Sequence, residues 1–157
     1  MAWGLVELAN RPDIQRNLQN ASIEVSEVRK EILRLWPPSW LFARDALVQI
    51  DVAGHRLPRG SHILISSWVL HRTTAWDDAM AFAPERWAEM PPPNAYIPYG
   101  AGKRFCMGAN FANGQIDAFL GVLRDKRIFP AGAAVYGSID DRATLVPVGL
   151  KFRVGSI

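Results

Sequence analysis

The sequence contains a single cysteine, Cys106, and the residues around it give its thiol a chemical setting. It lies in the stretch YGAGKRFCMG, residues 99–108, directly before a segment with helical periodicity. The backbone N–H groups and the dipole at a helix N-terminus stabilise a thiolate, the form that does chemistry or binds a metal. Gly102 and Gly108 would let the backbone approach a flat ligand, and Arg104 could pair with an acidic group at its rim. A buried, inert cysteine after a glycine turn is the alternative that the residues alone leave open.

Other chemical motifs are absent from the sequence. A phosphate-binding loop ending at Gly102-Lys103 requires glycine at Ile97 and serine or threonine at Arg104, and a dinucleotide fingerprint requires glycine at Phe105. There is no Gly-x-Ser-x-Gly or His-Glu-x-x-His motif. One cysteine excludes an intrachain disulfide, and the three separated histidines lack the paired spacing of a zinc site.

The cysteine stretch resembles the heme-binding loop of the cytochrome P450 superfamily, whose pattern is Phe-x-x-Gly-x-Arg-x-Cys-x-Gly. All positions match except the first, where Tyr99 keeps the aromatic ring and adds a hydroxyl that needs a partner. Two further segments match in the family's order: EILR at residues 31–34 resembles Glu-x-x-Arg, and FAPERW at residues 82–87 resembles the Pro-Glu-Arg segment. The resemblance implies that Cys106 is the axial thiolate ligand of heme b, and that Tyr99, Gly102 and Gly108 are further heme-binding residues of the loop.

The resemblance also implies roles for several charged residues. Arg104 and Arg44 would pair with the heme propionates. Glu31, Arg34 and Arg86 would form a buried cluster that pins the irregular, proline-rich segment against a helix. From spacing alone, Glu31 and Arg34 would be an ordinary surface pair worth a few tenths of a kcal/mol, and Arg44 would be a surface residue at a strand edge.

Some positions depart from the family pattern or carry no assigned chemistry. Gln115 stands where the family usually has glutamate, which weakens one expected ion pair. Thr73-Thr74 replaces the usual acidic turn after His71, to which we assign no chemistry. Trp40, Leu41 and Phe42 could contact a substrate, although core packing explains them equally well.

Hydrophobic periodicity predicts the elements that position these residues. Two helical segments meet at a break near Pro12, and a strong helix runs from Ser22, its expected N-cap, to Leu35. The remaining predictions are a hairpin of strands 47–52 and 63–65 around a turn at 53–60, an irregular segment over 71–105, a helix from just after Cys106 to about 123, and one or two strands within 144–154.

Composition sets the broad class of the chain. It has 157 residues, 49% hydrophobic and 21% charged, which is typical of a packed globular protein and not of a disordered one. The net charge of +3 is too small to indicate nucleic-acid binding. With no signal peptide and no apolar run long enough to span a membrane, we expect a soluble, cytoplasmic chain. Any membrane anchor of a longer protein would lie in a missing N-terminal part.

From about Trp3 to Val154 the chain resembles only the C-terminal part of the superfamily. We therefore expect a mainly α fold with small β-sheets, an α+β arrangement, forming one partial domain over residues 1–157. The N-terminal part and the long distal helix with its acid-alcohol pair would be absent. The complete enzyme would be a monooxygenase that inserts one oxygen atom from O2 into a small organic substrate, with electrons from a ferredoxin or flavoprotein reductase docking near Lys103. The alternatives are a truncated, non-catalytic remnant that binds heme weakly or not at all, and a small arginine-rich module for acidic partners or nucleic acid.

Overall fold

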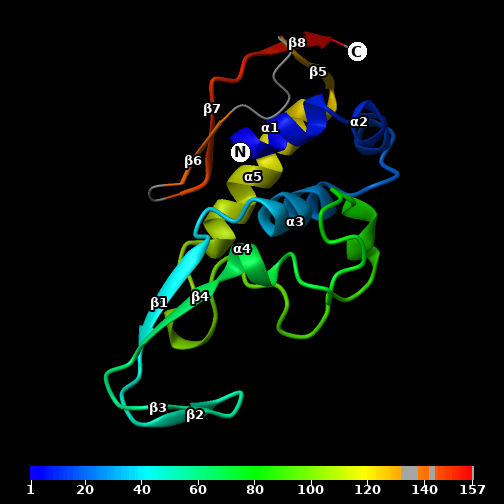
Figure 1. The fold of residues 1–157 in the computed structure, drawn as a ribbon. Helices are drawn as coiled ribbons and strands as arrows, with labels where there is room; N and C mark the ends of the chain where they lie inside the picture. The colour runs from blue at the N-terminus through cyan, green and yellow to red at the C-terminus, as the bar shows by residue number, and fades with distance from the viewer. Residues whose placement is uncertain (132–137, 142–143, 157) are drawn as a thin grey trace.

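The computed structural model describes residues 1–131, 138–141 and 144–156. Figure 1 shows α1 (Ala2–Ala9), α3 (Val25–Leu35) and α5 (Ala109–Arg124) packed together, with α2 (Pro12–Gln19) beside them. Pro12 occupies the first position of α2, where its missing N–H would have had no helical partner. The predicted break between the first two helices is therefore confirmed.

The hydrophobic core lies where α1, α3 and α5 meet. It buries the apolar stripe of each helix, and its members are Trp3, Val6, Leu8, Ala9, Ile14, Leu18, Ile23, Val28, Ile32, Leu35, Phe82, Leu120, Leu123 and Ile128. Phe82 belongs to the irregular segment, so that segment is anchored to the same core as the helices. This anchoring holds the segment in place although it has no strand ladder of its own.

The start of α3 differs from the prediction. Ser22 is not the N-cap, because its amide and hydroxyl both bond to Asn20 Oδ1 in a local turn, at 3.1 and 2.6 Å. The helix begins at Val25, and the Glu24 amide donates to Glu27 Oε2 at 2.7 Å. Its end at Leu35, just before Pro37, is as predicted.

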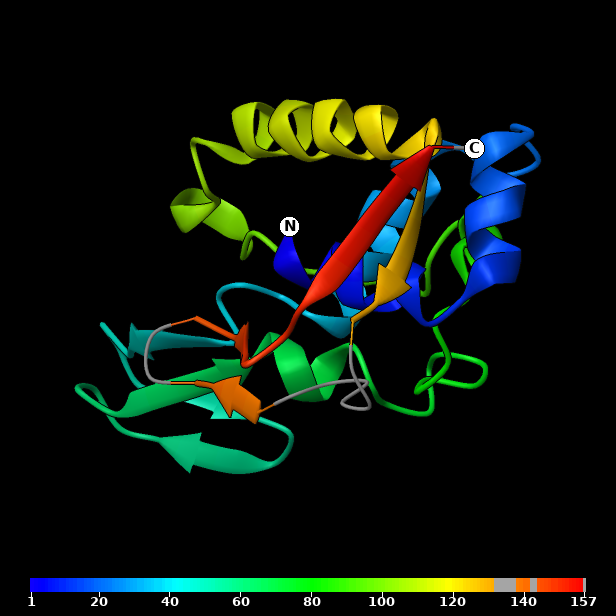
Figure 2. The ribbon, with the colours of Figure 1, turned by 90° about the horizontal axis from the view of Figure 1, so that it is seen from above.

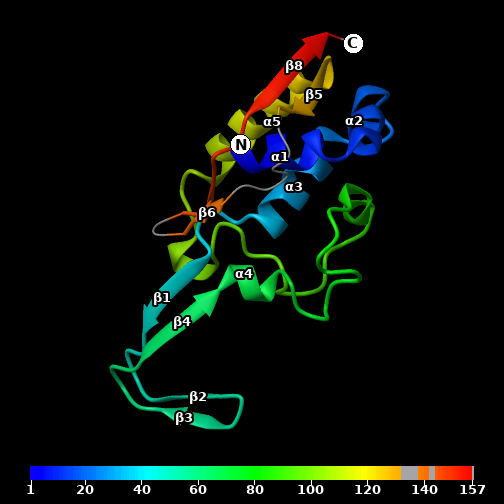
Figure 3. The ribbon, with the colours of Figure 1, turned by 45° about the horizontal axis from the view of Figure 1, so that its top comes forward.

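The strands after α3 pair differently from the predicted hairpin. β1 (Leu41–Asp45) pairs antiparallel with β4 (His62–Ser66), and the smaller hairpin of β2 (Ile50–Val52) and β3 (His55–Leu57) lies at its far end (Figure 3). The expected pairing of 47–52 with 63–65 is wrong. Ala53 and Gly54 both have positive φ, 48° and 82°, and form a two-residue turn that pairs Ile50 with Leu57.

Two more antiparallel pairs complete the described part of the fold. β5 (Lys126–Pro130) pairs with β8 (Phe152–Ser156) beside α5, and β6 (Ser138–Asp140) pairs with β7 (Val146–Val148) (Figure 2). The predicted terminal strands are confirmed with shifted bounds. Helices with small two-stranded sheets are the predicted fold class. Among the described residues, no helix combines the length and apolar character needed to cross a membrane.

The segment from 71 to 105 is irregular, as predicted. Its regular structure is limited to two short 3-10 turns, η1 (Pro84–Ala88) and η2 (Gly102–Arg104), and it follows α4 (Ser67–Leu70). The rings of Trp76, Trp87 and Tyr96 pack together with centroids 4.6 to 6.4 Å apart. Trp76 and Trp87 are only 5% and 7% exposed, whereas Phe105 at the end of the segment is 53% exposed.

Candidate functional site

A buried carboxylate, Glu31 on α3, gathers donors from the irregular segment. Arg34 binds it through two atoms, with Nε donating to Oε2 at 2.9 Å and Nη2 to Oε1 at 2.8 Å. Arg86 Nε donates to Oε1 at 3.1 Å. Glu31 and Arg34 are both fully buried, so the alternative of a surface pair is wrong. The structure thus brings together all three residues that the sequence placed in a cluster.

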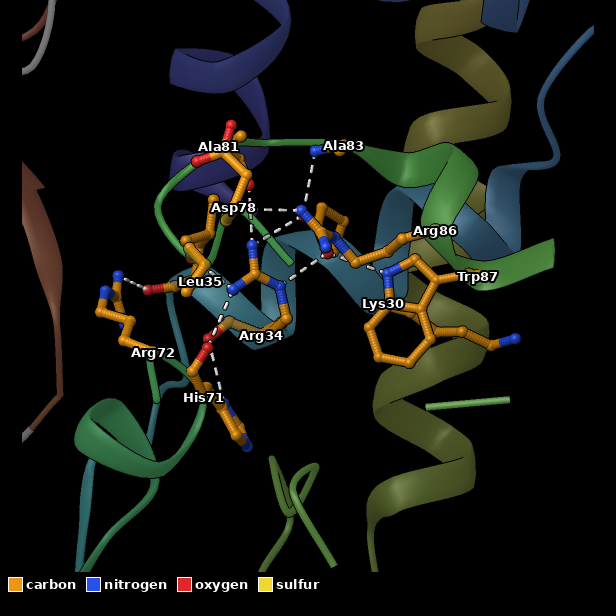
Figure 4. A network of polar contacts seen from close by, with 12 residues as sticks. Lys30, Arg34, Leu35, His71, Arg72, Asp78, Ala81, Ala83, Arg86 and Trp87 are labelled. Atoms are coloured by element: carbon orange, nitrogen blue, oxygen red, sulfur yellow. Dashed lines mark hydrogen bonds and ion pairs between the residues drawn. The ribbon is translucent and has the colours of Figure 1, made fainter. Parts of the chain in front are cut away.

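The remaining donors of the two arginines hold backbone carbonyls of the irregular segment. Arg34 donates to the carbonyl oxygens of Ala79 and Ala81 at 2.7 and 2.8 Å, and Arg86 donates to those of Asp77 and Asp78 at 2.7 and 3.2 Å (Figure 4). These bonds satisfy carbonyl groups that have no ladder partner. The cluster therefore fixes the path of the chain in front of α3.

Two further donors to Glu31 were not identified from the sequence. Trp87 Nε1 donates to Oε2 and the Ala83 amide donates to Oε1, both at 2.9 Å. Trp87 directly follows the Pro-Glu-Arg residues, so its position could have suggested a polar partner for its N–H. The Ala83 donor is a backbone amide, so no residue type in the sequence could have indicated it.

His71 is another residue whose role the sequence did not reveal. It is fully buried; its Nδ1 lies 3.0 Å from the Arg34 carbonyl oxygen, and its Nε2 accepts a hydrogen bond from the Ile97 amide at 2.9 Å. Burial lowers the pKa of His71 to about 4, and the charges of Arg34 and Arg72 act in the same direction. Its hydrogen bond to the Arg34 carbonyl opposes that shift.

A second polar group joins α1 to the end of α3. Glu7 Oε1 accepts from Trp36 Nε1 at 2.6 Å, and Arg11 pairs with the other carboxylate oxygen. The Trp36 ring stacks on Trp3 with centroids 3.6 Å apart and planes 3° from parallel. Burial raises the pKa of Glu7, which the Arg11 charge partly offsets. These contacts tie α1 to Trp36, the residue that directly follows α3.

The Cys106 loop lies just before α5. Cys106 is exposed, as are its neighbours from Ala101 to Gly108. Its amide donates to the Tyr99 carbonyl at 3.1 Å, and its carbonyl accepts from the amide of Ala109, the first residue of α5, at 3.3 Å. The alternative of a buried cysteine is therefore wrong. Cys106 itself lies three residues before the helix rather than at its first turn.

The glycines of this loop leave room beside the thiol. Gly102 has φ of 67°, which other residues rarely adopt, and a Cβ placed there would meet no atom within 4 Å. A Cβ at Gly108 would approach Cys106 Sγ at 3.8 Å. A ligand that reached the loop at these two positions would thus meet backbone and not side chain.

Tyr99 is bound at both ends. Its hydroxyl donates to Asn113 Oδ1 on α5 at 2.6 Å, its carbonyl accepts from Cys106, and its ring meets the edge of Phe105 with centroids 6.3 Å apart. Burial raises the pKa of Tyr99, an effect that the charge of Arg29 opposes. The extra hydroxyl at the first position of the motif thus has its partner in Asn113.

The two arginines expected near an acidic ligand lie at different depths. Arg104 is exposed in η2, and Arg44 is half-buried on β1, where its Nη1 donates to the Ala43 carbonyl at 2.8 Å. Neither makes an ion pair within the described part of the chain. Phe42 lies beside Gly100, since a Cβ built at Gly100 would be 3.6 Å from Phe42 Cε1. Arg44 lies two residues after Phe42 on β1 and therefore on the same face of the strand. Among the described residues, neither guanidinium group has a carboxylate partner.

Of the three residues after Pro38 considered as substrate contacts, Trp40 lines a cavity, and Leu41 is 39% exposed. Trp40, whose Nε1 donates to the Asp141 carbonyl at 3.2 Å, faces Trp68, Ile139 and Leu145 across this cavity of about 240 Å³. Gln115 is exposed. Across the described residues there is no group of three His, Cys, Asp or Glu side chains that could hold a metal ion.

Comparisons with known proteins agree with this arrangement. Residues 1–124 match the family model described as Cytochrome P450. The chain is 32% identical to geraniol 8-hydroxylase of Catharanthus roseus over 78% of its own length, and 42% identical to cyclooctatin synthase of Streptomyces melanosporofaciens over 54%. A crystal structure of a 6-coordinated cytochrome P450 from Thermus thermophilus superposes on 99% of the chain with a TM-score of 0.85 and 29% identity.

These similarities cover only part of each relative. The matched region is 30% of the geraniol hydroxylase, 19% of the cyclooctatin synthase and 43% of the Thermus chain. The chain therefore spans less than a third of the length of these two curated relatives.

Proposed function

Because the chain belongs to the cytochrome P450 family, a family of monooxygenases, we propose that Cys106 supplies the axial thiolate to the iron of heme b. The observation that carries this proposal is the exposed thiol on a fixed loop. Its amide is held by the Tyr99 carbonyl, its carbonyl by Ala109, and glycines stand at 102 and 108. An exposed thiol held in this way can approach an iron atom without rearrangement of the protein.

The residues around the thiol suit a porphyrin. Gly102 and Gly108 present no side chain to its plane. The guanidinium groups of Arg104 and Arg44, which make no ion pair with other described residues, can each bind a propionate in a charge-assisted pair. Tyr99 fixes the loop to α5 through its hydrogen bond to Asn113. A bound heme with a thiolate ligand supplies the iron at which dioxygen is activated, and the thiolate favours cleavage of the O–O bond.

The Glu31, Arg34 and Arg86 cluster has a structural role in this proposal. It lies inside the protein, and it holds the carbonyls of residues 77–81 while Glu31 also holds the Ala83 amide. The cluster thereby fixes the segment that leads to the Cys106 loop.

For the whole enzyme we propose insertion of one oxygen atom from dioxygen into a small organic substrate. Relatives named geraniol 8-hydroxylase and (+)-menthofuran synthase support a substrate of this class. Electrons would come from a ferredoxin or flavoprotein reductase. Lys103 and Arg104, both exposed next to Cys106, would attract an acidic face of such a donor.

A second candidate is a non-catalytic form that holds heme weakly or not at all. The observations that favour it are that the chain matches only 30% and 19% of the length of two relatives and that Cys106 is exposed. Proton delivery and substrate positioning depend on residues at that face.

The test is the spectrum of the purified chain after addition of heme, reduction and carbon monoxide. We expect the strongly red-shifted Soret band of a thiolate complex, and loss of that band in Cys106→Ser. Because Cys106 is exposed, this substitution should change the free energy of unfolding by less than about 0.5 kcal/mol. A chain that retains no heme would support the second candidate.

A further inference from the structure

Hydrogen bonds, together with the short stretch of backbone from Ile97 to Tyr99, connect the Glu31 cluster to the Cys106 loop. Arg34, paired with Glu31, exchanges two bonds with His71: its Nη1 donates to the His71 carbonyl at 2.9 Å, and its own carbonyl lies 3.0 Å from His71 Nδ1. His71 Nε2 then accepts from the Ile97 amide at 2.9 Å. Two residues later the Tyr99 carbonyl accepts from Cys106 at 3.1 Å.

The geometry fixes the protonation of His71. A carbonyl oxygen faces Nδ1, so Nδ1 must carry hydrogen, and an amide N–H faces Nε2, so Nε2 must be free to accept. The ring is therefore a neutral imidazole with one tautomer. In that state it joins α3 to the irregular segment, and no other side chain described bonds to the Ile97 amide.

The path from Ile97 to Cys106 is short and stiff. Pro98 locks its own φ and restricts the backbone of Ile97 before it. His71 fixes the orientation of the Ile97 amide, and the restricted backbone of Ile97 and Pro98 then limits the positions that Tyr99 can take. The flanking tyrosines add fixed points, because Tyr96 donates to the Lys30 carbonyl on α3 at 3.2 Å and Tyr99 donates to Asn113 on α5.

We propose that His71 is a positioning residue for the Cys106 thiolate, acting through Ile97, Pro98 and Tyr99. This proposal rests on the proposed function in one respect, which is that heme is taken as the ligand that the positioned thiolate binds. The series of bonds itself belongs to the protein. His71 thus does more than fill space beside α3, because it determines where the carbonyl that binds the Cys106 amide lies.

Two substitutions separate the two bonds of His71. Asparagine places an amide near the Nδ1 position, so His71→Asn keeps the bond to the Arg34 carbonyl and loses the acceptor for Ile97. Glutamine reaches the Nε2 position, so His71→Gln keeps that acceptor and loses the bond to Arg34. Gln15→Ala is the control, since Gln15 is buried and bonds to Leu8 and Ile128, away from the loop.

The measurements are amide hydrogen exchange of Ile97 and Cys106, and the reduced carbon-monoxide spectrum of the heme-loaded chain. In His71→Asn we expect exchange at both amides to accelerate about tenfold, as for the loss of one buried hydrogen bond. We also expect a larger fraction of the complex without the red-shifted thiolate band. His71→Gln should retain most of the wild-type behaviour, and Gln15→Ala should leave both readouts unchanged after correction for stability.

Equal effects of His71→Asn and His71→Gln, or the same loss in Gln15→Ala, would overturn the proposal. If the variants do not fold, nitrogen NMR of the wild-type chain tests the proposal by identifying which ring nitrogen of His71 carries hydrogen. Hydrogen on Nδ1 with a free Nε2 supports the proposal, and hydrogen on Nε2 refutes it. Failure of the wild type to bind heme would refute the proposed function, while the exchange measurements would still test His71.

Discussion

Replacing Glu31 with glutamine removes the negative charge that two guanidinium groups share. In the wild-type chain Oε1 accepts from Arg34, Arg86 and the Ala83 amide, and Oε2 accepts from Arg34 and Trp87. A glutamine that keeps its oxygen at the Oε1 position turns its NH2 group toward the two donors at Oε2. The substitution therefore leaves two unfavourable donor contacts and a buried arginine without its counter-charge.

The expected cost is large compared with the stability of a domain. Removing one partner of a buried ion pair costs about 3–5 kcal/mol, because the other charge stays desolvated. Glu31 and Arg34 are both fully buried, so solvent does not screen this loss. A typical domain has a free energy of unfolding of roughly 5–15 kcal/mol. We therefore expect Glu31→Gln to be partly unfolded under mild conditions.

The assay is urea-induced unfolding followed by tryptophan fluorescence, since the rings of Trp76 and Trp87 lie in or beside the cluster. The matched control is Glu85→Gln, an exposed glutamate of η1 in the same segment, for which we expect a change within about 0.5 kcal/mol. A loss for Glu31→Gln below about 1 kcal/mol, the value of an exposed ion pair, would refute the reasoning.

Two further predictions concern a buried histidine and a core leucine. The pKa of His71 is about 4 in the folded chain and 6.5 in its ordinary state, so below pH 6.5 the unfolded chain binds a proton that the folded chain does not. The free energy of unfolding should fall by up to about 3 kcal/mol as the pH drops from 6.5 toward 4. In denaturation experiments at the same pH values, His71→Gln should lack this pH-dependent loss. An identical pH slope in both chains would contradict the prediction. Leu120 is fully buried, so Leu120→Ala should cost about 2–5 kcal/mol in chemical denaturation. Val122→Ala, on the exposed face of α5, should cost under about 0.5 kcal/mol, and similar losses for both would argue against the described core.

The secondary-structure elements were predictable where a local rule determines them. The break at Pro12, the end of α3 before Pro37 and the run of α5 follow from proline geometry and a 3.6-residue period. The prediction failed in the β region, because strands 41–45 and 55–57 were not expected and the short hairpin of β2 and β3 lies within the connection between β1 and β4. Ala53 adopts a positive φ in the turn between β2 and β3, a conformation that an alanine side chain does not predict.

The candidate site was predictable only as far as its motif residues. Cys106, Glu31, Arg34 and Arg86 could be named because their types and spacing resemble a family pattern. His71 could not, because its partners are the backbone carbonyl of a residue 37 positions away and a backbone amide 26 positions away. Asn113, the partner of the Tyr99 hydroxyl, was hidden for a similar reason, since it depends on how α5 lies against the loop.

The sequence by itself therefore determined the family, the order of the helices and the identity of the exposed sulfur. These depend on residue types at short spacings, which local physical rules can interpret. Only the tertiary structure decided that Glu31 binds five donors and that His71 joins α3 to the Cys106 loop. Apart from Arg34, three residues after Glu31 on the same helix, the partners come together because an irregular chain folds back on α3, and they have no short spacing along the sequence.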